Sequence, residues 1–80
     1  MGKESKQYVD LEFLANISIR IKGLREDKNI TQEVFYNDTG INIGRIERLK
    51  RNPSVSTLKK ICEYLEISLE EFFSKGFDKN

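Results

Sequence analysis

A cluster of basic side chains lies in the second half of the sequence. Between Gly40 and Lys60 the chain carries six positive side chains against one negative side chain, that of Glu47, so this segment has a net charge of +5. The positive residues are Arg45, Arg48, Lys50, Arg51, Lys59 and Lys60. Guanidinium and ammonium groups bind anionic oxygens, and a planar guanidinium can pair with two acceptors at once. The chemistry that this segment favours is the binding of a polyanion.

The remaining charges make the chain polarised, although its formal net charge is only +1. Residues 1–39 have a net charge of −1 and residues 61–80 have a net charge of −3. A small domain with this distribution can present a basic face to phosphates while its other face stays neutral or acidic.

The composition excludes several functional classes. The 80 residues include no histidine and one cysteine, Cys62. A zinc finger, a His-based metal site and Ser-His-Asp or Cys-His catalysis are therefore excluded. We expect no enzyme activity, no metal and no cofactor. Because Cys62 lies in an apolar helical pattern, we expect it to be a small buried core residue.

The length of the chain is that of one domain with one core. We predict a flexible N-terminal tail over residues 1–9, a domain over residues 10–77 and a C-terminal tail over residues 78–80. No apolar run approaches the roughly 18 residues that a membrane helix needs, and the first ten residues are too polar for a signal peptide. We therefore expect a cytoplasmic protein without a membrane partner or an evident small-molecule ligand.

The first predicted helix begins after the capping residue Asp10 and ends near Asp27. Its apolar residues recur at helical spacing and form one buried stripe; they are Leu14, Ile17, Ile21 and Leu24. The stretch 17–22 also alternates as a strand would, but the stripe extends beyond it, so we favour a helix.

Two short helices follow in close succession. Thr31 is a good N-cap for the first of them, in which Val34 and Phe35 should face the core. Residues 37–40 predict a turn, in which Asp38 or Thr39 could cap the next helix. That helix should direct Ile43 and Ile46 inward, and residues 50–53 should form a loop because Pro53 disfavours helical geometry at Asn52.

Two further helices complete an all-α domain of five helices. Ser54 or Ser56 should cap the fourth, whose buried stripe is Leu58, Ile61, Cys62 and Leu65. Ser68 and Glu71 fit a capping box. The fifth helix should run from Leu69 to about Ser74, and Gly76 should stop it.

The order of these motifs resembles the Cro/phage-repressor helix-turn-helix family. The likeness covers about residues 17–73 and depends on several short motifs in their usual order, which are Thr31-Gln32-Glu33, Gly40, Arg45-Ile46-Glu47-Arg48, Arg51-Asn52-Pro53-Ser54 and Ile67-Ser68-Leu69-Glu70-Glu71-Phe72-Phe73. The resemblance implies a compact, lambda-repressor-like domain, in which the second and third helices form the helix-turn-helix and the third enters the major groove of DNA.

The resemblance also implies two groups of contact residues. The segment expected to contact bases begins at Gly40. In addition to Gly40, its residues expected to contact bases are Ile41, Asn42, Gly44, Arg45 and Arg48. Arg can pair bidentately with guanine and Asn with adenine, and an Ile can contact a thymine methyl group. The residues expected to contact phosphates, which position a protein without reading the sequence, are Thr31, Gln32, Lys50, Arg51 and Asn52.

The chain departs from the family pattern in two places. The segment between Thr31 and Glu47 is about three residues shorter than usual, so either the second helix loses a turn or the third starts late. Leu49 occupies the place where the family usually has glycine. Either Leu49 adopts a left-handed conformation, at a cost of roughly 1 kcal/mol, or the helix continues through Lys50.

Structural explanations compete with these functional ones. Arg45 and Arg48 could belong to a solvated helix face, but the surrounding turn pattern favours DNA contact. Glu47 should be structural, paired with an Arg or a backbone amide. Three aromatic residues exceed what one short helix can bury, so we predict a dimer interface that includes Phe72, Phe73 and Phe77. Tyr8, Val9, Leu11 and Phe13 are a second candidate surface.

These observations predict a sequence-specific, double-stranded-DNA-binding transcriptional regulator, a repressor or controller that acts as a homodimer on a pseudo-palindromic operator. The alternative is a protein-interaction module that keeps the helix-turn-helix fold without binding DNA. A strongly salt-dependent interaction with duplex DNA would separate the two.

Overall fold

A computed structural model describes residues 9–77, and these residues form five helices and no strand. The predicted all-α architecture is confirmed. The helices are α1 (Leu11–Asp27), α2 (Gln32–Thr39), α3 (Ile43–Glu47), α4 (Val55–Tyr64) and α5 (Leu69–Phe72). Residues 1–8 and 78–80, which include Tyr8 and most of the two predicted tails, lie outside the described part of the chain.

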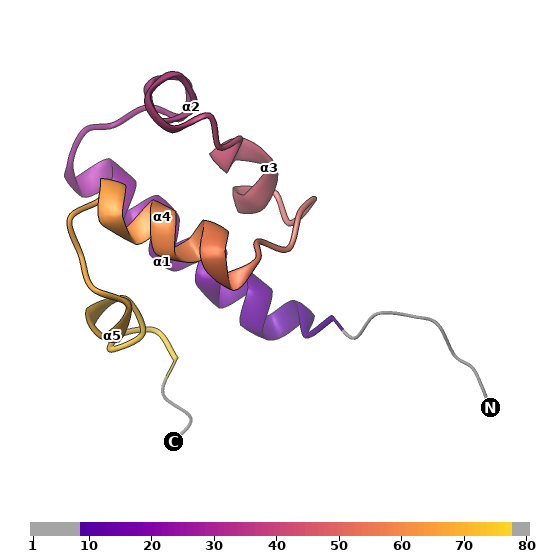
Figure 1. Ribbon diagram of the computed structural model, residues 1–80. Coiled ribbons are helices and arrows are strands. Elements are labelled where there is room, and N and C mark those ends of the chain that lie inside the picture. The colour runs from indigo at the N-terminus through magenta and orange to yellow at the C-terminus, as the bar shows by residue number, and fades with distance from the viewer. Residues whose placement is uncertain (1–8, 78–80) are drawn as a thin grey trace.

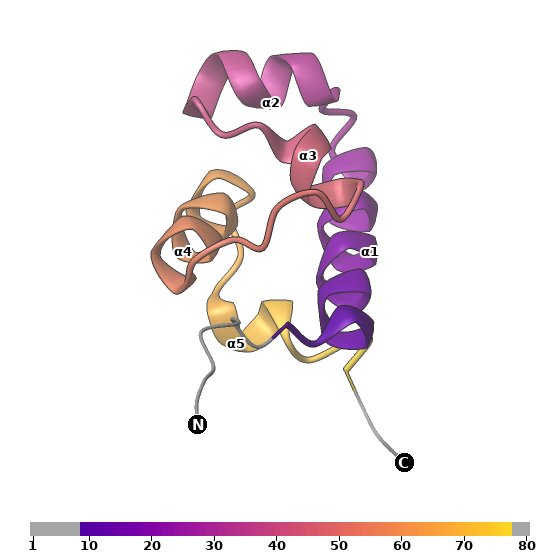
Figure 2. The ribbon, with the colours of Figure 1, turned by 90° about the vertical axis from the view of Figure 1, so that its right-hand side faces the viewer.

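The helices surround one core. α2 and α5 lie at opposite ends of the domain, and α1 runs along one side of it (Figures 1 and 2). Each helix contributes buried apolar side chains to a single cluster, which consists of Ile17, Ile21, Phe35, Ile43, Ile46, Leu58, Ile61, Cys62, Leu65 and Phe72. Cys62 is buried as expected, and burial raises the pKa of its thiol.

The burial pattern confirms most of the predicted stripes and corrects one residue. Leu14, Ile17 and Ile21 of α1 are buried, and Leu24 packs partly against the core. The prediction that Val34 faces the core is wrong, since 44% of this residue is exposed. Phe35 is fully buried, and consecutive residues of a helix point about 100° apart, so a short helix with Phe35 directed inward leaves its neighbour outside.

Each helix begins with a capping side chain, and four of the five caps are as predicted. The oxygens of Asp10, Thr31, Ser54 and Ser68 each accept a hydrogen bond from the backbone N–H three residues later. The expected cap of the third helix is wrong. Asp38 and Thr39 lie within α2, whose C-cap is Gly40 with φ +76°.

The ends of the helices also differ in part from expectation. α5 ends at Phe72 instead of Ser74, and its C-cap is Phe73, so the prediction that Gly76 stops this helix is wrong, although Gly76 does have a positive φ of +86°. Leu49 adopts the left-handed conformation, with φ +61°, and the Lys50 N–H donates to the carbonyl of Arg45 at 2.8 Å. α3 therefore closes with a Schellman-type turn instead of continuing through Lys50.

Candidate nucleic-acid interface

The segment between Thr31 and Glu47, which is shorter than usual, contains a very short third helix, α3. α2 retains eight residues, whereas α3 has five. The N-cap of α3 is Asn42, whose Oδ1 accepts a hydrogen bond from the Arg45 N–H at 3.2 Å. The two full turns of α2 and the brevity of α3 favour the alternative in which the third helix starts late.

Such a short helix presents few side chains outward. Ile43 and Ile46 are buried in the core, as expected. Arg45 is the one exposed residue within α3, and it is flanked by the exposed Asn42 and Arg48. Ile41, just before the cap, is partly buried against the core. Four of the five residues expected to contact bases thus lie together at the surface.

Gly44, the fifth of these residues, is buried, which contradicts its predicted contact with a base. A Cβ atom at this position would lie 2.9 Å from Oε1 of Gln32 and 3.0 Å from Nη1 of Arg48. The side chains of Gln32 and Arg48 therefore pack directly over Gly44. This crowding could not be predicted from local sequence, because the nearer of the two side chains, that of Gln32, comes from another helix.

A buried ion pair holds α3 against α1. Arg25 Nε donates to Glu47 Oε2 at 2.8 Å, and Arg25 Nη2 donates to Glu47 Oε1 at 2.9 Å. The two side chains are 8% and 5% exposed. Arg25 Nη1 donates to the carbonyl of Ile30 at 2.8 Å, so the guanidinium also holds the loop before α2. The prediction that Glu47 is structural and pairs with an Arg is confirmed.

Two more hydrogen bonds complete this network. Gln32 Nε2 donates to Glu47 Oε1 at 3.0 Å and connects α2 to the ion pair. Ser18 Oγ donates to the carbonyl of Ile46 at 2.8 Å and connects α1 to α3. The hydrogen bonds to Glu47 raise the pKa of Arg25 above its already high value, so the guanidinium stays charged. The roles of Arg25 and Ser18 could not be predicted from the sequence, because their partners lie in α3, more than 20 positions away.

Two other residues expected to contact DNA also hold the local backbone. Thr31 Oγ1 caps α2 through the Val34 N–H at 3.1 Å, and Asn42 caps α3. Thr39 Oγ1 bridges the turn between them, since it donates to the carbonyl of Phe35 at 2.8 Å and accepts from the Ile41 N–H at 3.0 Å. The caps of the two helices and the turn between them are therefore formed by side chains of their own segment.

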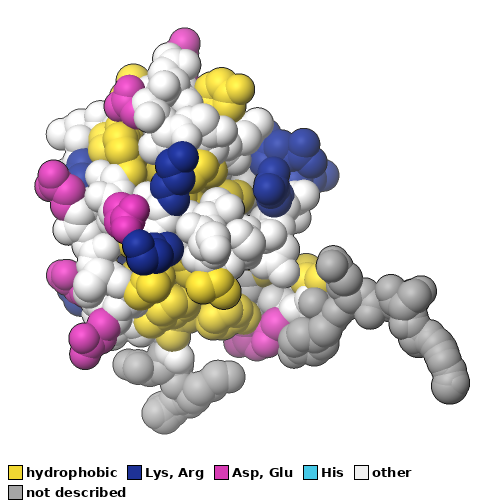
Figure 3. Space-filling model, in the orientation of Figure 1, with side chains coloured by type: hydrophobic (Ala, Val, Ile, Leu, Met, Phe, Trp, Pro, Cys, Tyr) yellow, Lys and Arg dark blue, Asp and Glu magenta, His cyan; other side chains and the backbone are white. Residues whose placement is uncertain are grey.

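The exposed basic residues lie in α3 and in the loop that follows it. Arg45, Arg48, Lys50 and Arg51 are all exposed, and Lys and Arg side chains gather over the loop that follows α3 (Figure 3). Within residues 9–77 the ion pairs are Arg25–Glu47, Lys28–Glu66 and Lys59–Glu63, so none of these four cations is paired there. Glu47, the one acidic residue between Gly40 and Lys60, has a buried side chain.

The loop after α3 folds back toward the turn between α2 and α3. Together with the start of α4 they enclose a hollow of about 170 Å³, which is lined by Gly40, Ile41, Asn42, Ile46, Arg51 and Thr57. Three residues expected to contact DNA, namely Ile41, Asn42 and Arg51, are thus brought together although ten positions separate the first from the last. Asn52 is exposed in the same loop.

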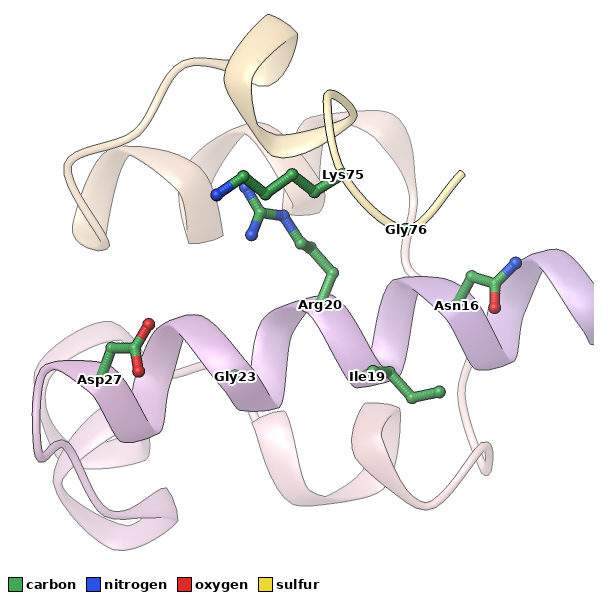
Figure 4. A pocket seen from close by; sticks show the side chains of 7 residues that line it. All are labelled: Asn16, Ile19, Arg20, Gly23, Asp27, Lys75 and Gly76. Carbon is green, nitrogen blue, oxygen red and sulfur yellow. The ribbon is translucent and has the colours of Figure 1, made fainter. Parts of the chain in front are cut away.

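A second hollow, of about 300 Å³, lies on the outer face of α1 (Figure 4). Arg20 and Lys75 project into it, and Asp27 lies farther along α1. The Arg20 guanidinium donates to the carbonyls of Phe72 and Glu71 at 2.8 and 3.0 Å, which holds the end of α5. This hollow has mixed charge, and α1 and the turn after α5 supply its walls, so it is separate from the basic surface.

The aromatic residues near the C-terminal end form a cluster with Phe13. The Phe73 ring lies 6.1 Å from the Phe13 ring and 4.9 Å from the Phe77 ring, measured between centroids. The expectation that Phe72 belongs to a dimer interface is wrong, because this residue is completely buried in the monomer. Phe73 and Phe77 are partly exposed.

The described residues hold no group of His, Cys, Asp and Glu side chains that could bind a metal ion. Among them there is also no helix with the length and hydropathy required to span a membrane. Comparison with protein families gave a match over residues 20–75 to the Cro/C1-type HTH DNA-binding domain. Comparisons with curated proteins and with solved structures gave no significant match.

Proposed function

This chain belongs to the Cro/C1-type helix-turn-helix DNA-binding family, and from that premise we propose that it is a transcriptional repressor or controller that recognises a specific sequence of double-stranded DNA. The family supports DNA binding and regulation in general. The sequence specificity, the direction of regulation and the residues in contact with DNA are the parts that we propose.

One observation carries the proposal. Four exposed cations surround the end of α3, and none of them has an ion-pair partner within residues 9–77. The carboxylate that could neutralise them is buried against Arg25 instead. Because the acid is buried and the four cations are unpaired within residues 9–77, this surface is suited to binding DNA phosphates. Each phosphate that a cation neutralises releases counterions from the duplex, which favours binding.

The exposed side chains divide into two proposed groups. Arg45 and Arg48 would pair with guanines and Asn42 with an adenine, while Ile41 would contact a thymine methyl group. The burial of Gly44 removes it from this group. The second group would contact phosphates and consists of Thr31, Gln32, Lys50, Arg51 and Asn52.

We further propose that the protein acts as a homodimer in the cytoplasm. A single α3 exposes so few side chains that one copy can read only a short sequence. Two copies on a pseudo-palindromic operator would place their α3 helices in successive major grooves, roughly 34 Å apart, and would double the number of base contacts.

The test is selection of bound duplexes from random DNA, repeated with Arg45→Ala. We expect the wild type to select a sequence, and Arg45→Ala to lose roughly 1–3 kcal/mol of binding free energy and to relax the preference at particular positions. Lys75→Ala is the matched control, because Lys75 is an exposed cation beyond α5, remote from α3, and we expect no change in preference.

Two outcomes would contradict the proposal. If Arg45→Ala keeps both the affinity and the preference of the wild type, the proposed base contacts are wrong. If the wild type shows no salt-dependent binding to any duplex, the alternative of a protein-interaction module with this fold replaces the proposal.

A further inference from the structure

The hollow on the outer face of α1 has charged groups of both signs around one space of about 300 Å³. This volume lies at the lower end of the range for small-molecule sites. The walls include Asn16, Arg20, Gly23 and Asp27 of α1, and Lys75 and Gly76 of the turn after α5 (Figure 4). None of these residues belongs to the proposed DNA-binding surface, so the proposed function does not account for the hollow.

Gly23 supplies part of this space, although the fold does not need a glycine there. It lies inside α1, where glycine is less favourable than alanine. A Cβ atom at this position would meet nothing within 4 Å, and the φ of Gly23 is not positive, so neither close packing nor backbone conformation requires a glycine. The missing side chain leaves room over α1 between Arg20 and Asp27. A glycine that costs stability and keeps a space open favours a ligand in that space.

The charges around this space are arranged along it. Arg20, Gly23 and Asp27 follow helical spacing and lie on one face of α1. The ion pairs within residues 9–77 do not include Asp27 or Lys75, although these two side chains carry opposite charges and line the same hollow. The hollow therefore offers a cationic partner to an anion and an anionic partner to a cation.

Arg20 is held in position before any ligand binds. Its Nε and Nη2 donate to the carbonyls of Phe72 and Glu71 at 2.8 and 3.0 Å, and its guanidinium lies 5.9 Å from the centre of the Phe72 ring. A guanidinium has further N–H groups that these two bonds leave available. A side chain that is already fixed loses little entropy when an anion binds. Together with Lys75, which also projects into the hollow (Figure 4), Arg20 suits a carboxylate.

We propose that this hollow binds a small, extended zwitterion, whose carboxylate lies between Arg20 and Lys75 and whose ammonium group lies at Asp27. The chain that joins the two groups crosses Gly23. Arg20 and Asp27 are separated by roughly 10 Å along the helix axis, so the two charges of a simple α-amino acid are too close together, whereas an ω-amino acid or a basic amino acid has a suitable length. No motif in the sequence indicates this site, because Lys75 lies 55 positions from Arg20.

NMR titration of the ¹⁵N-labelled full chain with ε-aminocaproate, without DNA, tests the site. Caproate, which lacks the ammonium group, and hexylamine, which lacks the carboxylate, are the matched probes. We expect ε-aminocaproate to cause saturable amide shifts along the outer face of α1 and in residues 73–77, and each single-charge probe to bind at least about tenfold more weakly. The absence of saturable shifts with ε-aminocaproate, or equal binding of caproate, would overturn the inference.

Substitutions in the walls locate the ligand. Gly23→Gln places a long, neutral side chain in the hollow and uses a residue type that favours helix, so it should abolish binding while α1 stays folded. Asp27→Asn and Lys75→Gln should each raise the Kd for ε-aminocaproate at least about tenfold. Glu26→Gln and Lys22→Gln are the matched controls, because both residues are exposed on α1 outside the hollow, and they should keep the wild-type Kd. Wild-type binding by Gly23→Gln would contradict the inference.

This inference goes beyond the proposed function and can fail separately from it. α1 and the turn after α5 supply the walls of the hollow, so Arg45→Ala in α3 should bind ε-aminocaproate as the wild type does. If the wild type binds no duplex, the proposed function fails, while the titration still decides whether the hollow takes a zwitterion. A wild type that binds DNA but shows no shifts with ε-aminocaproate contradicts only this inference.

Discussion

α1 and α3 lie against each other but owe their structures to different causes. α1 has 17 residues and a continuous apolar stripe, so its own sequence specifies both the helix and its buried face. α3 has five residues, fewer than an isolated helix needs to be stable in water. Its position depends on side chains from elsewhere, namely Ser18 and Arg25 of α1 and Gln32 of α2.

The difference shows where the proposed binding surface is vulnerable. A long helix tolerates the loss of a single contact because many others remain. α3 is held through Glu47 by a bidentate pair that is nearly inaccessible to solvent, so the loss of one partner leaves an uncompensated charge. We expect substitutions that affect α3 to change stability and binding more than comparable substitutions in the long helices.

The largest effect should come from Glu47→Ala. This change leaves the Arg25 guanidinium buried without its partner, and breaking a buried pair costs about 3 kcal/mol of unfolding free energy. Urea denaturation measures the loss, and DNA affinity should fall with it because α3 loses its anchor.

Glu63→Ala is the control for that experiment. Glu63 pairs with Lys59 on the exposed face of α4, and exposed pairs of this kind contribute less than about 1 kcal/mol. Equal losses of stability from the two substitutions would show that the buried Arg25–Glu47 pair contributes no more to stability than an exposed pair.

A gain of stability should come from Leu49→Gly. Leu49 ends α3 at φ +61°, a conformation that costs an L-residue roughly 1 kcal/mol and that glycine adopts freely. We expect thermal denaturation to shift upward. Asn29→Gly at the end of α1, where φ is +59°, should gain less because Asn tolerates the left-handed region. A larger gain at Asn29 than at Leu49 would contradict this explanation.

Two glycines allow a direct comparison of α1 with α3. A Cβ at Gly23 of α1 would meet nothing within 4 Å, so Gly23→Ala should stabilise the protein by about 0.8 kcal/mol through helix propensity. Gly44→Ala makes the same change in α3 but displaces Gln32 from Glu47, which removes a hydrogen bond worth about 1 kcal/mol. Chemical denaturation should show a gain for the first and none for the second; equal gains would refute the tight contact at Gly44.

The smallest effect concerns an exposed bond at the far end of α2. Tyr64 Oη donates to Asp38 Oδ2 at 2.5 Å, and this bond raises the pKa of Tyr64. Because the folded-state pKa exceeds the unfolded value near 10, the bond stabilises the protein at neutral pH and is lost as the pH rises through the folded-state pKa.

The corresponding experiment compares the wild type with Tyr64→Phe. The wild type should be slightly more stable at pH 7, and this difference should shrink above a pH of about 10. Tyr36→Phe, at an exposed position of α2, should match the wild type throughout. A difference for Tyr64→Phe that is constant with pH would exclude the bond to Asp38 as its cause.

Local sequence patterns were sufficient to predict most of the fold. Thr31 and Ser68 could be identified as caps because each precedes a helical pattern without a competing residue nearby, whereas Ser54 and Ser56 competed and the structure selects Ser54. The cap of α3 was mistaken because Asp38, Thr39 and Asn42 are all good candidates within five positions, and the extent of α2 decides among them. Val34 and Phe35 are adjacent and both apolar, so local sequence could not tell which one faces the core.

The candidate site was less predictable, because tertiary contacts determine it. Glu47 could be recognised as an acid in a basic segment, but its partner Arg25 lies 22 positions away. Gly44 lies under a side chain of α2, and Phe72 is fully buried in the core that all five helices form. These three features depend on how the helices pack, which the spacing of residues along the chain does not specify.

An NMR titration of the ¹⁵N-labelled protein with a duplex chosen by selection tests most directly whether the surface around α3 binds DNA. If the surface held by the Arg25–Glu47 pair binds DNA, the amide resonances that shift should be concentrated in residues 40–52 and at the start of α2. Shifts concentrated around α5 and the outer face of α1, with those of residues 40–52 unchanged, would contradict the account.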